Sequence, residues 1–224
     1  TVSYVERSSA DPQTLTFYDK AEARFEMLLN IFKVFGHAPE LGTVFTDTVM
    51  AILKDGALPW VTKELLILKA THRNECQYCV VQHETLSKRL GISDAKIADI
   101  GDERYQGSPH FTDAEKALMD LTVQIGVDAN RIPKALWDRL HSHFSEAQIV
   151  EAVFTITTYI AISKFGDALG VALEQVFTGG FPNPNHQAVV AGLSVGIYAD
   201  AHFFIHHEYQ SAHHFLFQNV VAGG

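Results

Sequence analysis

The fold prediction begins with residues 59–91, which read PWVTKELLILKATHRNECQYCVVQHETLSKRLG. Pro59 suits the first turn of a helix, because the N–H that proline lacks has no helical partner there. We therefore predict a helix over 60–71, with apolar residues at helical spacing. Asn74 is a favourable N-cap for a second helix, over 75–90. The two helices are expected to form an antiparallel hairpin that carries both cysteines of the chain.

The helical period continues outside this hairpin, and no stretch alternates convincingly with the period of a strand. Further helices are predicted over 19–35, 39–54, 94–100, 112–124, 132–143 and 145–177, and a last helical segment over 187–221. Residues 178–185 contain two glycines and two prolines and are the one convincing linker. The prediction is an all-α protein with a domain over 1–180 and a C-terminal helical extension over 181–224.

The composition of the 224 residues is that of a globular protein, with 47% hydrophobic and 19% charged residues. The formal net charge of −9 argues against binding to nucleic acid or to an anionic membrane, which need clustered Lys and Arg. Residues 1–9 lack the pattern of a signal peptide. The apolar stretch 189–205 contains Asp200 and His202, so we interpret it as a buried or interface helix. The expected compartment is the cytoplasm.

Cys76 and Cys79 form a CxxC motif. A structural disulfide is unusual in the cytoplasm, so a close cysteine pair there is more often catalytic or metal-binding. A spacing of three residues places both thiols on one face of a helix, close enough to form a disulfide. The first turn of a helix also favours the thiolate. The motif therefore predicts a redox-active dithiol.

Two further residues extend this motif into a candidate catalytic site. His83 lies one helical turn after Cys79, where a neutral imidazole can take a proton from the thiol or an imidazolium can stabilise the thiolate. Glu64 lies on the preceding helix of the hairpin. Its carboxylate is expected to turn toward the same site, where it can orient His83 or relay protons to Cys76.

Two other interpretations of these residues stay open. The cysteines can be small buried residues of the core. Alternatively, Cys76, Cys79 and His83 supply three ligands for structural or catalytic zinc, and Glu64 can supply a fourth.

The motif resembles the signature of a known family. Glu64, then eleven residues, then Cys76-Gln77-Tyr78-Cys79, then three residues and His83 is similar to the signature of the alkyl hydroperoxidase D-like (AhpD-like) branch of the carboxymuconolactone decarboxylase superfamily. Leu90-Gly91-Ile92-Ser93, residues 111–118 and residues 145–151 also match the style of this branch. The resemblance covers about residues 15–178.

This resemblance implies an all-helical domain that assembles into homo-oligomers, commonly trimers or hexamers, and that reduces a small hydroperoxide. It implies that Cys79 is the peroxidatic thiol, activated by His83, and that Cys76 resolves the sulfenic acid to a disulfide. Glu64 serves in the proton relay with Cys76 and His83, and an external dithiol donor restores the pair. No cofactor is expected, because the dithiol itself holds the two electrons.

The chain departs from the family in two ways. Some members carry a histidine immediately before the second cysteine, where this chain has Tyr78, so a relay through that histidine is rearranged or absent. The segment after Gly180 has no match in the family. Lactone decarboxylation is disfavoured, because the decarboxylase branch typically lacks the CxxC.

The C-terminal extension is rich in histidine: His186, His202, His206, His207, His213 and His214, with Glu208. His202 and His206 have a common metal-ligand spacing on a helix. We favour the interpretation that the extension docks on a neighbouring subunit, since its aromatic residues need covering. The alternative function is a metal-binding or oligomeric scaffold in which the dithiol is only a redox sensor.

Overall fold

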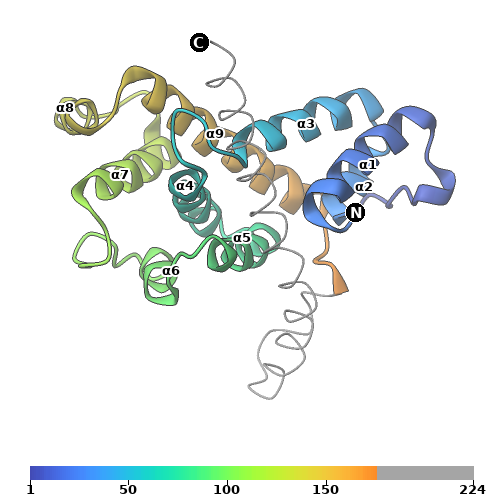
Figure 1. The fold of residues 1–224 in the computed structure, drawn as a ribbon, viewed down its shortest axis with the longest axis horizontal. Coiled ribbons are helices and arrows are strands. Elements are labelled where there is room, and N and C mark those ends of the chain that lie inside the picture. The colour runs from blue at the N-terminus through green and yellow to red at the C-terminus, as the bar shows by residue number, and fades with distance from the viewer. Residues whose placement is uncertain (176–224) are drawn as a thin grey trace, which may run out of the picture. The chain divides into compact units, whose positions relative to one another are not determined.

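The computed structural model describes residues 1–175, and within this range the chain forms nine α-helices, one 3₁₀ helix and no strand (Figure 1). The elements are η1 (Arg7–Ser9), α1 (Pro12–Phe25), α2 (Asn30–Phe35), α3 (Pro39–Ile52), α4 (Trp60–Arg73), α5 (Gln77–Arg89), α6 (Asp94–Gly101), α7 (Asp113–Asp128), α8 (Lys134–His143) and α9 (Glu146–Leu169). The prediction of an all-α fold is confirmed.

Residues Thr1–Glu174 form one compact unit. The predicted boundary at residue 180 and the histidine-rich extension 181–224, with His202 and His206, lie outside the described residues. The division into those two domains therefore stays a prediction.

The helix predicted over 19–35 is wrong, because the chain breaks between α1 and α2. Glu26 ends α1 in the left-handed region, with φ 61°, and Leu29 caps α2 in an extended conformation. The break turns the chain so that the rings of Phe25 and Phe32 lie 5.6 Å apart. Aromatic packing between the two helices thus replaces the continuous helix that the periodicity indicates.

Helix α3 packs against α1 and α2, and a column of rings joins this group to α9. The rings of Phe35 and Phe45 stack at 4.4 Å, and Phe35 also stacks on Phe165 of α9 at 4.7 Å. These contacts hold the N-terminal helices against the helix that later forms one wall of the site.

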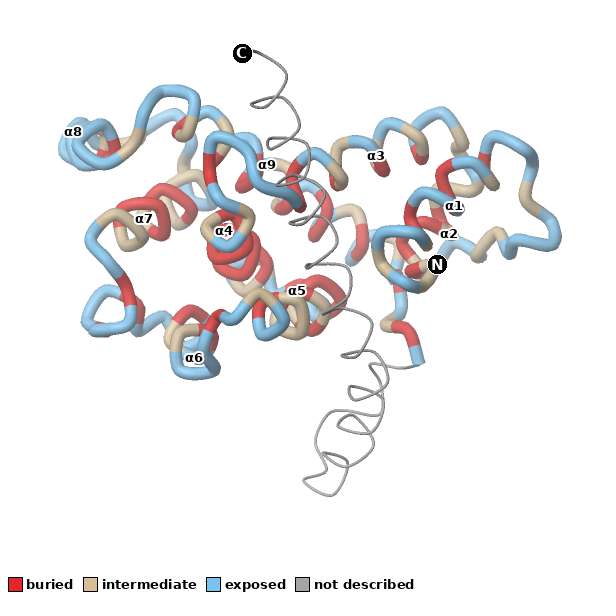
Figure 2. The backbone as a smooth tube through the Cα atoms, in the orientation of Figure 1, coloured by how far each residue is buried: buried red, intermediate tan, exposed pale blue. Residues whose placement is uncertain are grey.

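Helix α4 is the most deeply buried element of the described domain (Figure 2). It packs against α5, α6, α7 and α9. The consecutive residues from Lys63 to Thr71 are all buried, including two lysines and a glutamate. A helix buried on all sides holds its polar side chains in fixed positions, because each one needs a partner inside the protein.

Helix α9 is long and apolar enough to cross a membrane by length and composition alone, but a core helix passes the same test. Here its buried face, which includes Ile149, Ile156 and Tyr159, packs against α4, α5 and α7. The helix ends at Leu169 because Gly170 turns left-handed, with φ 64°. The predicted continuation to residue 177 is therefore wrong.

Candidate active site

The turn between α4 and α5 places the CxxC motif. Glu75 adopts φ 56°, and the N–H groups of Glu75 and Cys76 donate to the carbonyls of His72 and Thr71 at 3.0 and 3.2 Å. This is a Schellman ending of α4, in which a left-handed residue reverses the chain. Asn74 is consequently the C-cap of α4. The prediction that Asn74 is the N-cap of the next helix is wrong. The chain returns at once along α4 as α5.

Cys76 is itself the N-cap of α5. Its Sγ accepts a hydrogen bond from the backbone N–H of Cys79 at 3.4 Å, so the first turn of α5 is closed on a sulfur. The two Sγ atoms lie 2.8 Å apart and share a hydrogen bond, and both thiols are free. Cys76 is 0% and Cys79 3% exposed. The spacing predicted one face and close thiols, and the structure has both.

The shared hydrogen bond makes the two thiols titrate as one unit. The hydrogen bond between the two sulfurs lowers the pKa of Cys76, because it favours a thiolate there. The same bond, together with burial and the charge on Cys76, raises the pKa of Cys79. The pair therefore loses a first proton readily and retains the second. The lowered pKa is that of Cys76, so these directions do not by themselves select Cys79 as the attacking sulfur.

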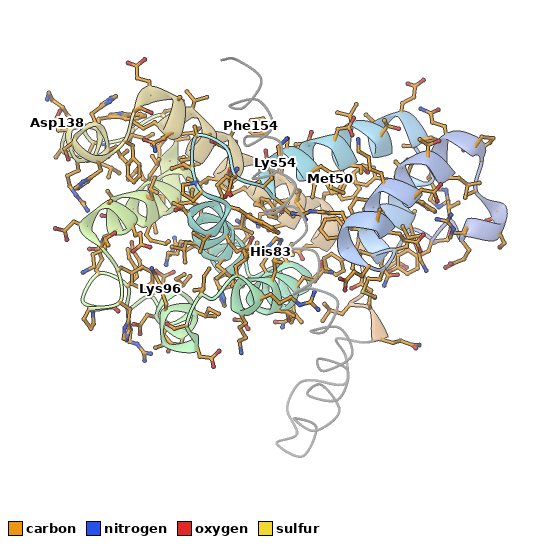
Figure 3. The ribbon with its side chains drawn as sticks, viewed as in Figure 1. Met50, Lys54, His83, Lys96, Asp138 and Phe154 are labelled. Carbon is orange, nitrogen blue, oxygen red and sulfur yellow. The ribbon has the colours of Figure 1, made fainter. Side chains whose placement is uncertain are left out.

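Glu64 of α4 meets His83 of α5, and His83 is labelled in Figure 3. The Nδ1 of His83 lies 2.5 Å from Oε1 of Glu64. A carboxylate in this position makes Nδ1 the N–H donor, which leaves Nε2 as the ring atom that exchanges protons. Glu64 has no exposed surface, and its Oε2 is buried without a hydrogen-bond partner among the described residues. The structure thus brings Glu64 to His83, while no hydrogen bond in the described region joins the His83 ring to a sulfur.

Helix α9 adds three side chains to the site that the sequence did not indicate. The ring of Tyr159 meets the edge of His83 at 4.8 Å between centroids. Ser163 donates its hydroxyl to Sγ of Cys79 over 3.8 Å. Asp167 contributes negative charge that raises the pKa of both thiols. Their spacing of four residues puts them on one face of α9, and that spacing was the only signal in the sequence.

Tyr159 stays protonated in this setting. Burial raises its pKa well above the usual value, and the negative charges of Glu64 and Cys79 act in the same direction. The ring therefore holds the imidazole in place without competing for its protons.

Tyr78, the residue inside the CxxC, belongs to a different network. Its hydroxyl accepts from the N–H of Ile31 at 3.2 Å and donates to Oε1 of Glu174 at 3.0 Å. Glu174 also accepts from the N–H of Asn30 at 2.6 Å and from Nε2 of Gln82 at 3.0 Å. Burial and the Glu174 charge raise the pKa of Tyr78. This tyrosine ties the motif to α2 and does not take the place of a relay histidine.

The four residues considered as zinc ligands do not converge on one point. Glu64 is directed to Nδ1 of His83, and the two sulfurs face each other. Within residues 1–175 no group of three or more His, Cys, Asp or Glu side chains is placed to hold a metal ion. The zinc interpretation of the CxxC therefore has no support in this geometry.

Part of the chain, including the candidate site, matches a known family. Residues 39–124 match the model of the carboxymuconolactone decarboxylase family, and this range contains Glu64, both cysteines and His83. Among curated proteins, the chain is 23% identical over 134 residues to an uncharacterized protein, YdfG, of Bacillus subtilis (strain 168), covering 59% of this chain and 89% of YdfG.

Two solved structures share the fold. A peroxidase-related protein from Ralstonia eutropha JMP134, described as an alkylhydroperoxidase AhpD core, superposes with a TM-score of 0.70 at 16% identity, covering 79% of this chain and 93% of that one. The debrominase Bmp8, solved as a cysteine-to-alanine variant in complex with 2,3,4-tribromopyrrole, superposes with a TM-score of 0.66 at 20% identity, covering 78% and 91%. The described domain thus has the AhpD-like helical fold.

Proposed function

We propose that this chain, part of which matches the carboxymuconolactone decarboxylase family, is a thiol-dependent peroxidase that reduces a small organic hydroperoxide with its CxxC dithiol. One observation carries the proposal: the two free thiols lie 2.8 Å apart in the first turn of α5, and a buried Glu64–His83 pair stands one turn further on. A dithiol of this kind stores two electrons, the number that cleavage of a peroxide bond requires.

The first step is attack by Cys79. Its thiolate forms a bond to the terminal peroxide oxygen, the O–O bond breaks, and the alkoxide leaves with a proton as an alcohol. His83 is suited to give that proton from Nε2, because Glu64 holds Nδ1 and stabilises the imidazolium. Cys79 is left as a sulfenic acid, and it has been oxidised by two electrons.

The second step is resolution by Cys76. Its sulfur forms a bond to the Cys79 sulfur, the S–O bond breaks, and the hydroxyl leaves as water after taking up a proton. The sulfurs already lie within reach, so closure needs only a small movement. An external dithiol then reduces the Cys76–Cys79 disulfide by exchange and is itself oxidised. The protein is proposed to act as a homo-oligomer, as the family resemblance implies.

Steady-state turnover tests this function. The full chain is supplied with an organic hydroperoxide and a dithiol reductant, and the loss of peroxide is compared for wild type and Cys79→Ser. We expect catalytic turnover by wild type and the background rate for the variant. Because Bmp8 is a debrominase with this fold, a brominated pyrrole is assayed in parallel. Turnover of the pyrrole alone, or equal peroxide rates for the two proteins, contradicts the proposal.

A further inference from the structure

A buried hydroxyl lies against one of the two reacting sulfurs. Ser163 Oγ donates to Cys79 Sγ over 3.8 Å, and Ser163 has no exposed surface. Among the described residues, this is the only side-chain hydrogen bond from a hydroxyl to either sulfur. The group of α9 that acts on Cys76 is instead the Asp167 carboxylate, which raises the pKa of that thiol. The hydroxyl therefore acts on Cys79 and not on Cys76.

The orientation of this hydroxyl is not the usual one for a helix. Hydroxyl side chains within helices commonly donate to the carbonyl four residues earlier. Buried Thr46, Thr122 and Thr155 do so, at 2.8, 2.9 and 2.8 Å. Thr155 lies two turns before Ser163 on the same helix. The hydrogen bond of Ser163 is made instead to the sulfur that faces it from α5.

We propose that Ser163 is a hydrogen-bond donor that stabilises the thiolate of Cys79, the sulfur that attacks the peroxide in the proposed function. A hydroxyl that donates to a thiolate favours the charged form. In the peroxide reaction the serine keeps its proton throughout and supplies neither electrons nor atoms. The step it assists rests on the proposed function, whereas its effect on the resting thiol does not.

The other groups that face Cys79 oppose this effect or act indirectly. The hydrogen bond to Cys76, burial and the Asp167 charge all raise the pKa of Cys79, whereas Ser163 lowers it. Tyr159, which is sensitive to the charge of Cys79, stays neutral. Apart from Ser163, the groups named here thus disfavour the thiolate of Cys79.

The test uses the fact that the chain has only two cysteines. In a Cys76→Ser background Cys79 is the sole thiol, and the pH dependence of its alkylation by iodoacetamide gives its apparent pKa. Adding Ser163→Ala is expected to raise this pKa by about one unit, and so to slow alkylation about tenfold below it. Alanine favours the helix interior, so α9 is expected to stay intact.

Two further variants make the result specific. Ser87→Ala removes another fully buried serine hydroxyl, one that has no partner among the described residues, and is expected to leave the pKa of Cys79 unchanged. Ser163→Thr keeps a hydroxyl and is expected to recover part of the shift. Equal pKa values in the Ser163→Ala and Ser87→Ala proteins overturn the inference, as does a Ser163→Thr protein that matches Ser163→Ala.

The outcome is separable from that of the proposed function, because alkylation consumes no peroxide. A shifted pKa of Cys79 in a protein that does not turn over hydroperoxide supports the role of Ser163 and contradicts the proposed peroxidase activity. Peroxide turnover with an unshifted pKa of Cys79 contradicts the role of Ser163 and supports the proposed peroxidase activity.

Discussion

Lys63 and Glu64 are consecutive residues of α4, and neither has exposed surface, yet their surroundings differ. Lys63 pairs with Glu151 of α9 at 2.6 Å, and Glu151 accepts a second hydrogen bond from the N–H of Leu58 at 2.8 Å. Glu64 pairs with His83 of α5 at 2.5 Å, but its second oxygen is buried without a partner in the described region. Both carboxylate oxygens of Glu151 thus have hydrogen-bond partners, whereas Glu64 has a partner for only one of its two.

The difference separates a structural role from a chemical one. A buried ion pair tolerates desolvation when further hydrogen bonds satisfy the remaining atoms, as at Glu151. An unsatisfied buried oxygen is costly and is rarely kept without a use. Glu64 faces the ring that would exchange protons with a substrate, so its open oxygen fits a site where protons move. We therefore expect that breaking the first pair costs stability and that breaking the second costs activity.

The largest effect is expected from Glu151→Ala, which leaves the Lys63 ammonium buried and unpaired. The free energy of unfolding should fall by about 3 kcal/mol, measured by denaturant titration. The control is Asp138→Ala, which breaks the exposed Lys134–Asp138 pair on α8 (Figure 3) and should change stability by less than about 0.5 kcal/mol. Equal losses for the two variants would show that burial of Lys63 does not govern stability.

The second prediction concerns Glu64→Gln, which preserves shape but removes the charge beside His83. Peroxide turnover should fall about a hundredfold, because the imidazolium loses its stabilising partner. Stability should hold or rise, since a buried charge is removed. Glu84→Gln is the matched control, because Glu84 pairs with His72 across the same two helices at 3.1 Å but is partly exposed. If both variants lose activity equally, the buried pair has no special role.

The candidate site also shows what the sequence alone could predict. Glu64, Cys76, Cys79 and His83 lie within twenty residues of one another, so the spacing on a helical hairpin was enough to group them. Ser163 and Asp167 reach the same thiols from the far end of the domain. Inside a long apolar helix their four-residue spacing was not enough to identify them, because their role depends on how α9 packs on α5.

The residues at which helices begin and end were less predictable from the sequence than the presence of the helices. The helix starts predicted at Thr112 and Ser145 are confirmed, and each residue caps its helix in a local capping box. The break at Glu26 and the C-cap at Asn74 were missed, since the left-handed residue in each turn, Glu26 or Glu75, is not a glycine. The histidine-rich extension, with His202 and His206, stays a prediction.

The third prediction concerns the hydrogen bond between the two cysteine sulfurs. The hydrogen bond with the Cys79 side chain lowers the pKa of Cys76, so removing that partner with Cys79→Ala leaves burial to raise it. The pKa of Cys76 should rise by about one unit, followed by alkylation of the single remaining thiol against pH. Cys79→Ser retains a donor and should keep most of the shift. Identical values in the two variants would mean that the thiols do not share a proton.

The smallest effect is expected at Glu75, in the turn that sets how α4 and α5 face each other. Its φ of 56° is costly for a residue with a side chain, whereas the same ending of α5 uses Gly91 at φ 82°. Glu75→Gly should stabilise the fold by about 0.5–1 kcal/mol in a thermal melt, with turnover unchanged. A loss of stability would place the constraint in the Glu75 side chain and not in its backbone.

The central claim is that Cys76 and Cys79 carry the two electrons that reduce a hydroperoxide. Its most direct test is a titration of the fully reduced protein with less than one equivalent of organic hydroperoxide, without reductant, followed by intact-mass and peptide analysis. We predict one Cys76–Cys79 disulfide and one alcohol for each peroxide consumed. Peroxide that persists beside two unmodified thiols would contradict the claim.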